Sequence, residues 1–197
     1  MHRFFVGLSR LMAALGGLVL SGLILLMCLS VVGRTLNTVL HAAAVQALMP
    51  GFADWALSTG IGPIEGDFEL VEAGIAFSIF AFMPYCHITL GHASVDIFTS
   101  WFSERAQKIQ GVLIEMLFAV VLVVIAVQLE AGMQSKMRSG QTTFLLQFPI
   151  WWAYALSFFG AAVAAIVGIY MAIVRVVELA SGKTLIGDAI GDDIEQS

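Results

Sequence analysis

The stretch Ile150–Val174, IWWAYALSFFGAAVAAIVGIYMAIV, decides the fold class because it contains no charged side chain. A second charge-free stretch, Leu11–Gly33, reads LMAALGGLVLSGLILLMCLSVVG. A helix needs about 20 apolar residues to cross about 30 Å of hydrocarbon, and both stretches are longer than that. Each of them therefore predicts a membrane-spanning helix.

Two further runs, 69–90 and 111–131, carry few charges, so the predicted spans are 11–33, 69–90, 111–131 and 150–174. The whole chain is 59% hydrophobic and 12% charged, against roughly half and a quarter in soluble domains. A soluble protein of 197 residues could not bury four such helices. We predict an all-α membrane protein whose residues 1–197 form a single transmembrane domain.

Lysine and arginine predict the orientation, because they gather on the cytoplasmic side of a membrane protein. With a cytoplasmic N-terminus, six of these residues lie inside and three outside, so we predict that both termini are cytoplasmic. The inner six are Arg3, Arg10, Arg105, Lys108, Arg175 and Lys183, and the outer three are Arg34, Lys136 and Arg138. The first apolar stretch is too long for the core of a signal peptide, so it is read as a retained span.

The segments between the spans have different characters. A long outer loop, 34–68, contains an Ala- and Leu-rich part that predicts a short helix before Pro50-Gly51. Residues 95–106 predict a short amphipathic helix between spans two and three, with aromatic side chains suited to membrane lipid. An ordinary loop is the alternative there. The acidic tail, 184–197, is expected to be mobile.

Ionisable residues inside the predicted spans lie near the ends and leave the middle empty. Glu69, Glu72 and Glu130 fall at the outer end, where Arg34, Lys136 or Arg138 could pair with them. Glu115 and His87 fall towards the inner end, and Arg105 or Lys108 are the predicted partners of Glu115. Transporter sites usually lie at the bilayer midplane, so this pattern argues against transport by this chain alone.

The sequence shows no pattern that is typical of an enzyme or a cofactor site. The histidines are not placed to hold a haem between two spans, and tetrahedral zinc spacing is absent. No nucleophile, base and orienting group gather on one side of the membrane. A basic stripe for nucleic acid is also missing. Cys28 and Cys86 fall at opposite membrane faces, which excludes a disulfide between them.

Small residues recur every fourth position on two spans. The ridge on the fourth span consists of Gly160, Ala164, Gly168 and Ala172. On the first span, Ala13, Gly17 and Ser21 have the same spacing. Ridges of this kind let membrane helices pack closely. Whether they face each other or a partner protein is open at this point.

Several motifs occur in an order that resembles one family. They are Ser30–Arg34 (SVVGR), Gly66–Glu72 (GDFELVE), Gly91–Asp96 (GHASVD), Thr142-Thr143 and Phe148–Tyr154 (FPIWWAY). Together they resemble the small, DctQ-like permease subunit of TRAP transporters. The resemblance implies four spans in the inner membrane, and partnership with a large permease subunit and a periplasmic substrate-binding protein.

The resemblance further implies sodium-coupled uptake of organic acids, with sodium bound by the large subunit and no cofactor in this chain. The chain itself would be a scaffold and not an enzyme. The loop 34–68 is longer than the resemblance suggests, and we hypothesise that it contacts one of the partners. A membrane-anchor subunit of a redox complex is the alternative function.

These arguments together select one set of residues as candidates for structural or subunit-interface roles. His92 and Asp96 belong to it because residues four apart share a helix face, or because Asp96 could cap the helix that follows. The full set is Arg34, Glu69, Glu72, His92, Asp96, Glu115, Trp151, Gly160, Ala164 and Gly168.

Overall fold

The computed structural model of the chain describes residues 2–89 and 104–181, and helices make up most of them. The six helices are α1 (His2–Leu40), α2 (Ala43–Leu48), α3 (Pro50–Ser58), α4 (Asp67–Ile88), α5 (Glu104–Ser139) and α6 (Trp151–Ser181). Four of these helices, α1, α4, α5 and α6, are long and apolar enough to cross a membrane. The predicted all-α membrane fold with four spans is confirmed.

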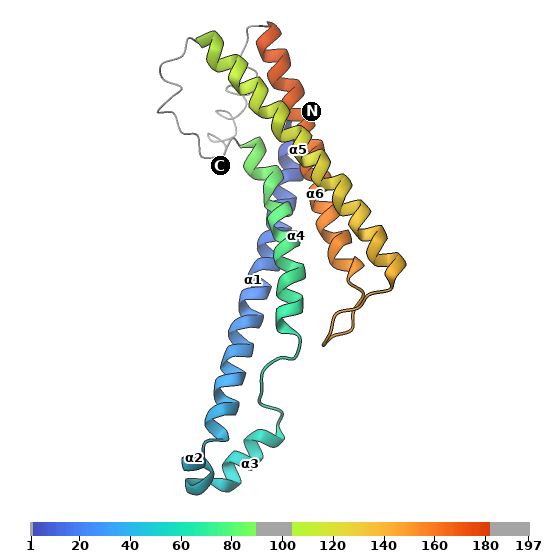
Figure 1. Cartoon of the computed structure of the whole chain (residues 1–197). Coiled ribbons are helices and arrows are strands. Elements are labelled where there is room, and N and C mark those ends of the chain that lie inside the picture. The colour runs from blue at the N-terminus through green and yellow to red at the C-terminus, as the bar shows by residue number, and fades with distance from the viewer. Residues whose placement is uncertain (1, 90–103, 182–197) are drawn as a thin grey trace.

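Some predictions fall outside the described residues. The amphipathic helix at 95–106 lies there except for its last three residues, which belong to the start of α5. His92, Asp96 and the tail 184–197 also lie outside. The described ends of α1 and α6, His2 and Ser181, are at the same end of the bundle (Figure 1). The side of the membrane on which they lie stays a prediction.

Helix α1 is longer than the predicted span 11–33. Its 39 residues measure about 58 Å at the rise of an α-helix, well beyond the hydrocarbon thickness. Arg10 and Arg34 mark the limits of the charge-free stretch, yet both are exposed on the helix. An exposed charged side chain does not end a helix, and α1 therefore continues past both.

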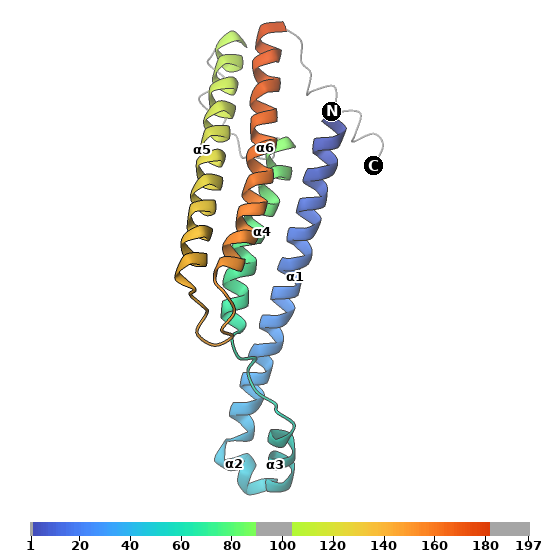
Figure 2. The same cartoon turned by 90° about the vertical axis from the view of Figure 1, so that its right-hand side faces the viewer.

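The long helices form two pairs. Helix α1 packs along α4, α5 packs along α6, and α4 packs along α6 between the pairs. Figure 2 shows α1 and α5 on opposite sides of this central contact. We call the end that holds the first turn of α4 the arm end, and the end that holds His2 and Ser181 the terminal end.

Glycines make the close approaches between these helices. A Cβ atom on Gly160 would lie 2.9 Å from the Cβ of Phe80 on α4, and one on Gly168 would lie 3.0 Å from Leu122 on α5. The ridge on α6, with Ala164 fully buried, thus faces the chain's own helices. The spacing alone did not decide whether this ridge faces the chain itself or a partner, and the contacts of Gly160 and Gly168 place it inside the chain.

The ridge predicted on α1 does not pack against the chain's own helices at Gly17 and Ser21, so whether it faces a partner stays a prediction. A Cβ atom on Gly17 would meet nothing within 4 Å, and Ser21 is exposed. Gly16 makes the contact instead, with Ala81 of α4. Small residues occur on two faces of this helix, and spacing alone does not say which face is buried.

Residues 34–66 form an arm that extends beyond the other helices at the arm end (Figure 1). Leu40 of α1 packs there with Ala53 and Ala56 of α3. Pro50 was predicted to break the helix, and it separates α2 from α3 as the first residue of α3, where proline is tolerated. The side chain of Asn37 donates to the carbonyl of Ile61, 2.9 Å away, and holds the returning chain against α1.

Candidate functional site

The first turn of α4 carries two acidic side chains that are buried, Asp67 and Glu69. Gly66 precedes them with φ of 75°, a left-handed conformation that glycine adopts without strain. A side chain at Gly66 would also collide with Leu146. Carboxylates are favourable at a helix N-terminus because the helix dipole is positive there. The two acids contact different neighbours, and these contacts hold the arm end together.

Asp67 joins α4 to α1. The hydroxyl of Ser30 donates to Asp67 Oδ2 over 2.5 Å, and an Arg34 guanidinium nitrogen lies 3.8 Å from the same oxygen. Ser30 Oγ also accepts the backbone N–H of Ile64, at 3.2 Å. Ser30 is fully buried whereas the Arg34 side chain is 64% exposed. The Ser30 hydroxyl therefore makes the buried contact with Asp67, and the Arg34 guanidinium adds a positive charge at the exposed edge of that contact.

Glu69 joins α4 to the loop between α5 and α6. Its two carboxylate oxygens accept the backbone N–H groups of Leu145 and Leu146, at 2.7 and 3.0 Å. The loop is itself folded, because Thr143 N donates to the carbonyl of Phe148 and Phe148 N donates to the Thr143 hydroxyl. A backbone held in this way presents two parallel donors to one carboxylate.

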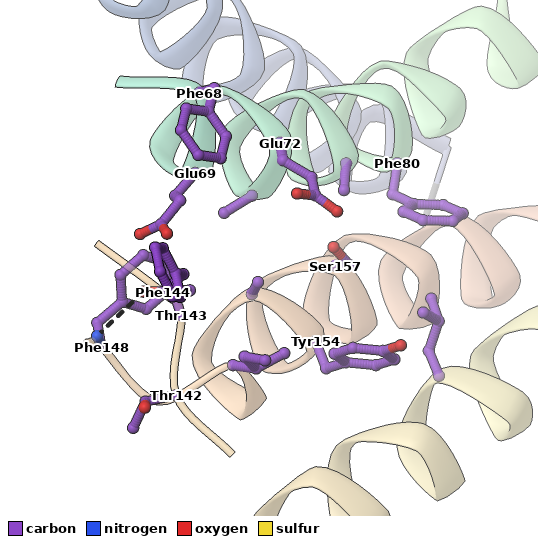
Figure 3. Close-up of a pocket in the computed structure, with 15 residues that line it drawn as sticks. Phe68, Glu69, Glu72, Phe80, Thr142, Thr143, Phe144, Phe148, Tyr154 and Ser157 are labelled. Atoms are coloured by element: carbon purple, nitrogen blue, oxygen red, sulfur yellow. Dashed lines mark hydrogen bonds between the residues drawn. The ribbon is translucent and has the colours of Figure 1, made fainter. Parts of the chain in front are cut away.

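A pocket of about 490 Å³ lies behind the Glu69 contact, between α4, α6 and the 140–150 loop. Figure 3 shows Glu72 projecting into it from α4, on the side that faces Ser157 of α6. Phe80 and Tyr154 form part of its walls, which are mostly apolar. Glu72 is exposed, unlike Glu69 one turn before it. The pocket thus combines apolar walls with one accessible carboxylate.

The terminal end holds a different ionisable contact. His87 Nε2 of α4 and Glu115 Oε2 of α5 are 2.9 Å apart, and both residues are buried. The ring of Phe118 lies 5.5 Å from the imidazole ring, centroid to centroid. This contact is a direct link between α4 and α5, which otherwise lie on either side of α6.

The pairings predicted from charge differ from those that the structure shows. Arg34 lies beside Asp67 and not beside Glu69, Glu72 or Glu130. Glu69 accepts backbone amides, and Glu115 lies beside His87, with 2.9 Å between Oε2 and Nε2. Three further side-chain contacts lie at the arm end. Lys136 donates to Gln141, Arg138 donates to Gln134, and Gln134 donates to Glu130.

Sequence reasoning missed Asp67 and Ser30 as contact residues. A signal existed for Asp67, because it is the first residue of the span and lies at the depth of Arg34. No signal existed for the amides of Leu145 and Leu146, since every residue except proline has one. Trp151, also a candidate, is half-buried at the start of α6 and packs edge-on against Trp152.

Within residues 2–89 and 104–181, no three histidine, cysteine or acidic side chains lie together in a way that could hold a metal ion. Cys28 is exposed and Cys86 is half-buried, and no disulfide joins the two.

Comparison with known families identifies the chain. Residues 23–179 match the model of the family described as "Tripartite ATP-independent periplasmic transporters, DctQ component". The chain belongs to the DctQ family. As a DctQ chain it is the small membrane component of a TRAP transporter, and it is a multi-pass protein of the inner membrane. No curated protein and no solved structure gives a significant match.

The matched range includes the second part of α1 from residue 23 onward, the arm, the contacts of Asp67 and Glu69, and nearly all of α6. The arm is thus within the part of the chain that the DctQ family covers. Members of this family are components of transporters, and the family is not a family of enzymes.

Proposed function

We propose that this chain is the scaffold for the large permease subunit of a sodium-coupled uptake system for organic acids. The large subunit would bind sodium and substrate, and a periplasmic binding protein would deliver the substrate. Both termini would be cytoplasmic, which makes the arm end the periplasmic end. Membership of the DctQ family supports the tripartite assembly.

One observation carries the scaffold role. From Ala73 to Cys86 in α4, from Met116 to Leu129 in α5 and along the span of α6, the described helices have no acidic or basic side chain. Charged side chains at that depth commonly mark ion and substrate paths, and the described parts of these helices have none there. The transport path therefore belongs in another chain.

Exposed apolar surface supports a partner in the membrane. On α5, Leu113, Leu117, Val120, Val124 and Val127 form one stripe, with each side chain more than half exposed. Such a stripe is compatible with contact to lipid or to another membrane protein. A large subunit packed on this chain would cover part of such surface.

The arm supports contact with a partner outside the membrane. It extends beyond the outer ends of the other helices (Figure 2), and its tip exposes Leu48, Met49, Phe52 and Trp55. Aromatic side chains are enriched where proteins bind each other. We infer that the arm contacts the binding protein or the large subunit during delivery of substrate.

Co-purification and uptake test the proposal. The full-length chain, tagged and extracted in mild detergent, should bring down a larger multi-span protein. The reconstituted three-component system should take up an organic acid only with a sodium gradient and only when this chain is present. A version lacking residues 43–60 should still bind the large subunit but should lose uptake. A haem absorbance band in the purified complex would instead favour the anchor of a redox complex.

A further inference from the structure

The pocket beside Glu72 has a feature that the scaffold role does not use. It places a carboxylate among apolar walls, at the end of the membrane-spanning part of α4. The described basic side chains at the arm end have other contacts. Arg34 lies beside Asp67, Lys136 donates to Gln141, and Arg138 donates to Gln134. Within the part of the chain that the structure describes, no cation compensates Glu72.

Glu69 does not reduce the negative charge of the pocket. Both of its oxygens already accept backbone N–H groups of the loop, and its negative charge remains in the same pocket wall. A negatively charged ligand would thus be repelled by two carboxylates. A ligand with a positive group would find one acceptor, Glu72, that is accessible and free of a described ion pair.

The size of the pocket limits the class of ligand. A pocket of this size is within the range that small-molecule sites have, about 300–1,000 Å³. A flexible hydrocarbon chain fits such a space between α4 and α6, where Ala76 and Ala153 leave room for it.

The depth of the pocket is that of a lipid headgroup. Tyr154 lines it, and Trp151 and Trp152 lie on the preceding turn of α6. Tryptophan and tyrosine gather at the boundary between headgroups and hydrocarbon. At the mouth, Phe144 is 88% exposed and Phe68 is 55% exposed. A ligand with an ammonium group at one end and an apolar tail at the other would meet matching surroundings at both ends.

We propose that this pocket binds an aminophospholipid, with the headgroup ammonium on the Glu72 carboxylate and one acyl chain between α4 and α6. The primary ammonium of phosphatidylethanolamine donates hydrogen bonds to the carboxylate. The quaternary ammonium of phosphatidylcholine supplies the charge without those bonds, and phosphatidylglycerol supplies no positive charge. The bound lipid would fill the space behind the Glu69 contact and support the separation of α4 from α6 there.

Native mass spectrometry of the full-length chain in mild detergent tests this site. The protein is delipidated and offered equal amounts of phosphatidylethanolamine, phosphatidylcholine and phosphatidylglycerol. We expect retention in that order. Glu72→Gln keeps the shape of the side chain and should weaken retention of phosphatidylethanolamine about tenfold, while phosphatidylglycerol changes little. Ala76→Phe, which fills the pocket, should lower retention of all three lipids.

Glu130→Gln is the matched control. Glu130 lies on α5 at the same end of the bundle, outside the pocket lining, and its carboxylate accepts from Gln134. It should leave lipid retention at the wild-type level. Equal retention of phosphatidylethanolamine and phosphatidylglycerol by the wild type would overturn the proposal. So would a Glu72→Gln protein that keeps its lipid but loses a co-purified membrane protein, since the carboxylate would then serve a protein contact.

Discussion

The ionisable side chains at the two ends of α4 contact different kinds of group. At the terminal end, His87 meets one specific side chain, Glu115 of α5, and both are buried. At the arm end, Glu69 accepts two backbone amides of the 140–150 loop, and Asp67 accepts the hydroxyl of Ser30 with Arg34 at its rim. One end depends on the identity of a partner side chain, whereas the other depends mainly on the course of the backbone.

This difference decides what each end can tolerate. A contact between two buried ionisable side chains is lost when either one is replaced, because both members of the contact are side chains. A contact with backbone amides has only one replaceable member, since substitution of Leu145 or Leu146 does not remove the N–H group. The terminal end should therefore be the more sensitive of the two.

Glu115→Ala should have the largest effect. It leaves His87 buried between α4 and α5, and breaking a buried pair in this way costs about 3–5 kcal/mol. We expect a clear fall in the melting temperature of the detergent-purified chain, followed by circular dichroism. Replacing both residues by leucine should recover much of the loss, because apolar side chains of similar volume often replace a buried ionisable pair without loss of stability. If the single and double replacements melt together, the pair does not act as a unit.

Gly160→Ala tests the contact that lies between the two ends. The new Cβ would lie 2.9 Å from the Cβ of Phe80 and 3.3 Å from its backbone carbon, so α4 and α6 must move apart. Overpacking of this kind costs about 1–3 kcal/mol. The melting temperature should fall by less than for Glu115→Ala.

Gly17→Ala is the control for Gly160→Ala, because the new methyl group meets nothing within 4 Å. It should leave the melting temperature close to the wild-type value. A larger loss for Gly17→Ala than for Gly160→Ala would mean that α1 contacts another chain through the face that carries Gly17, and the packing order of the helices would need revision.

The fold was predictable from the sequence to the extent that it depends on the absence of charge. Leu11–Gly33 and Ile150–Val174 contain no charged residue, and a helix is the simplest way to satisfy the backbone of such a stretch in a membrane. The extension of α1 to Leu40 was not predictable in this way, because Arg34 was taken as a boundary, although a largely exposed guanidinium beside Asp67 is compatible with a continuing helix.

The contacts at the arm end were less predictable, for a physical reason. Opposite charges at matching depth predict ion pairs, but Glu69 is satisfied by amides whose position depends on the fold of the 140–150 loop. The small-residue ridge of α6 was predicted with the correct residues. Its direction, with Gly160 towards α4 and Gly168 towards α5, depends on the arrangement of three helices, which local spacing does not contain.

Glu69→Gln should have the smallest effect on overall stability and the most local one. A neutral amide offers one oxygen where the carboxylate offers two, so one of the two loop amides loses its acceptor. We expect hydrogen exchange at Leu145 and Leu146 to accelerate about tenfold or more, while amides in the middle of α6 keep their protection. Arg34→Gln is the comparison, because its exposed guanidinium does not contact the loop and exposed ion pairs contribute little. It should leave the exchange of both amides unchanged. Acceleration by Arg34→Gln as strong as that by Glu69→Gln would show that charge, and not the backbone contact, holds the arm end closed.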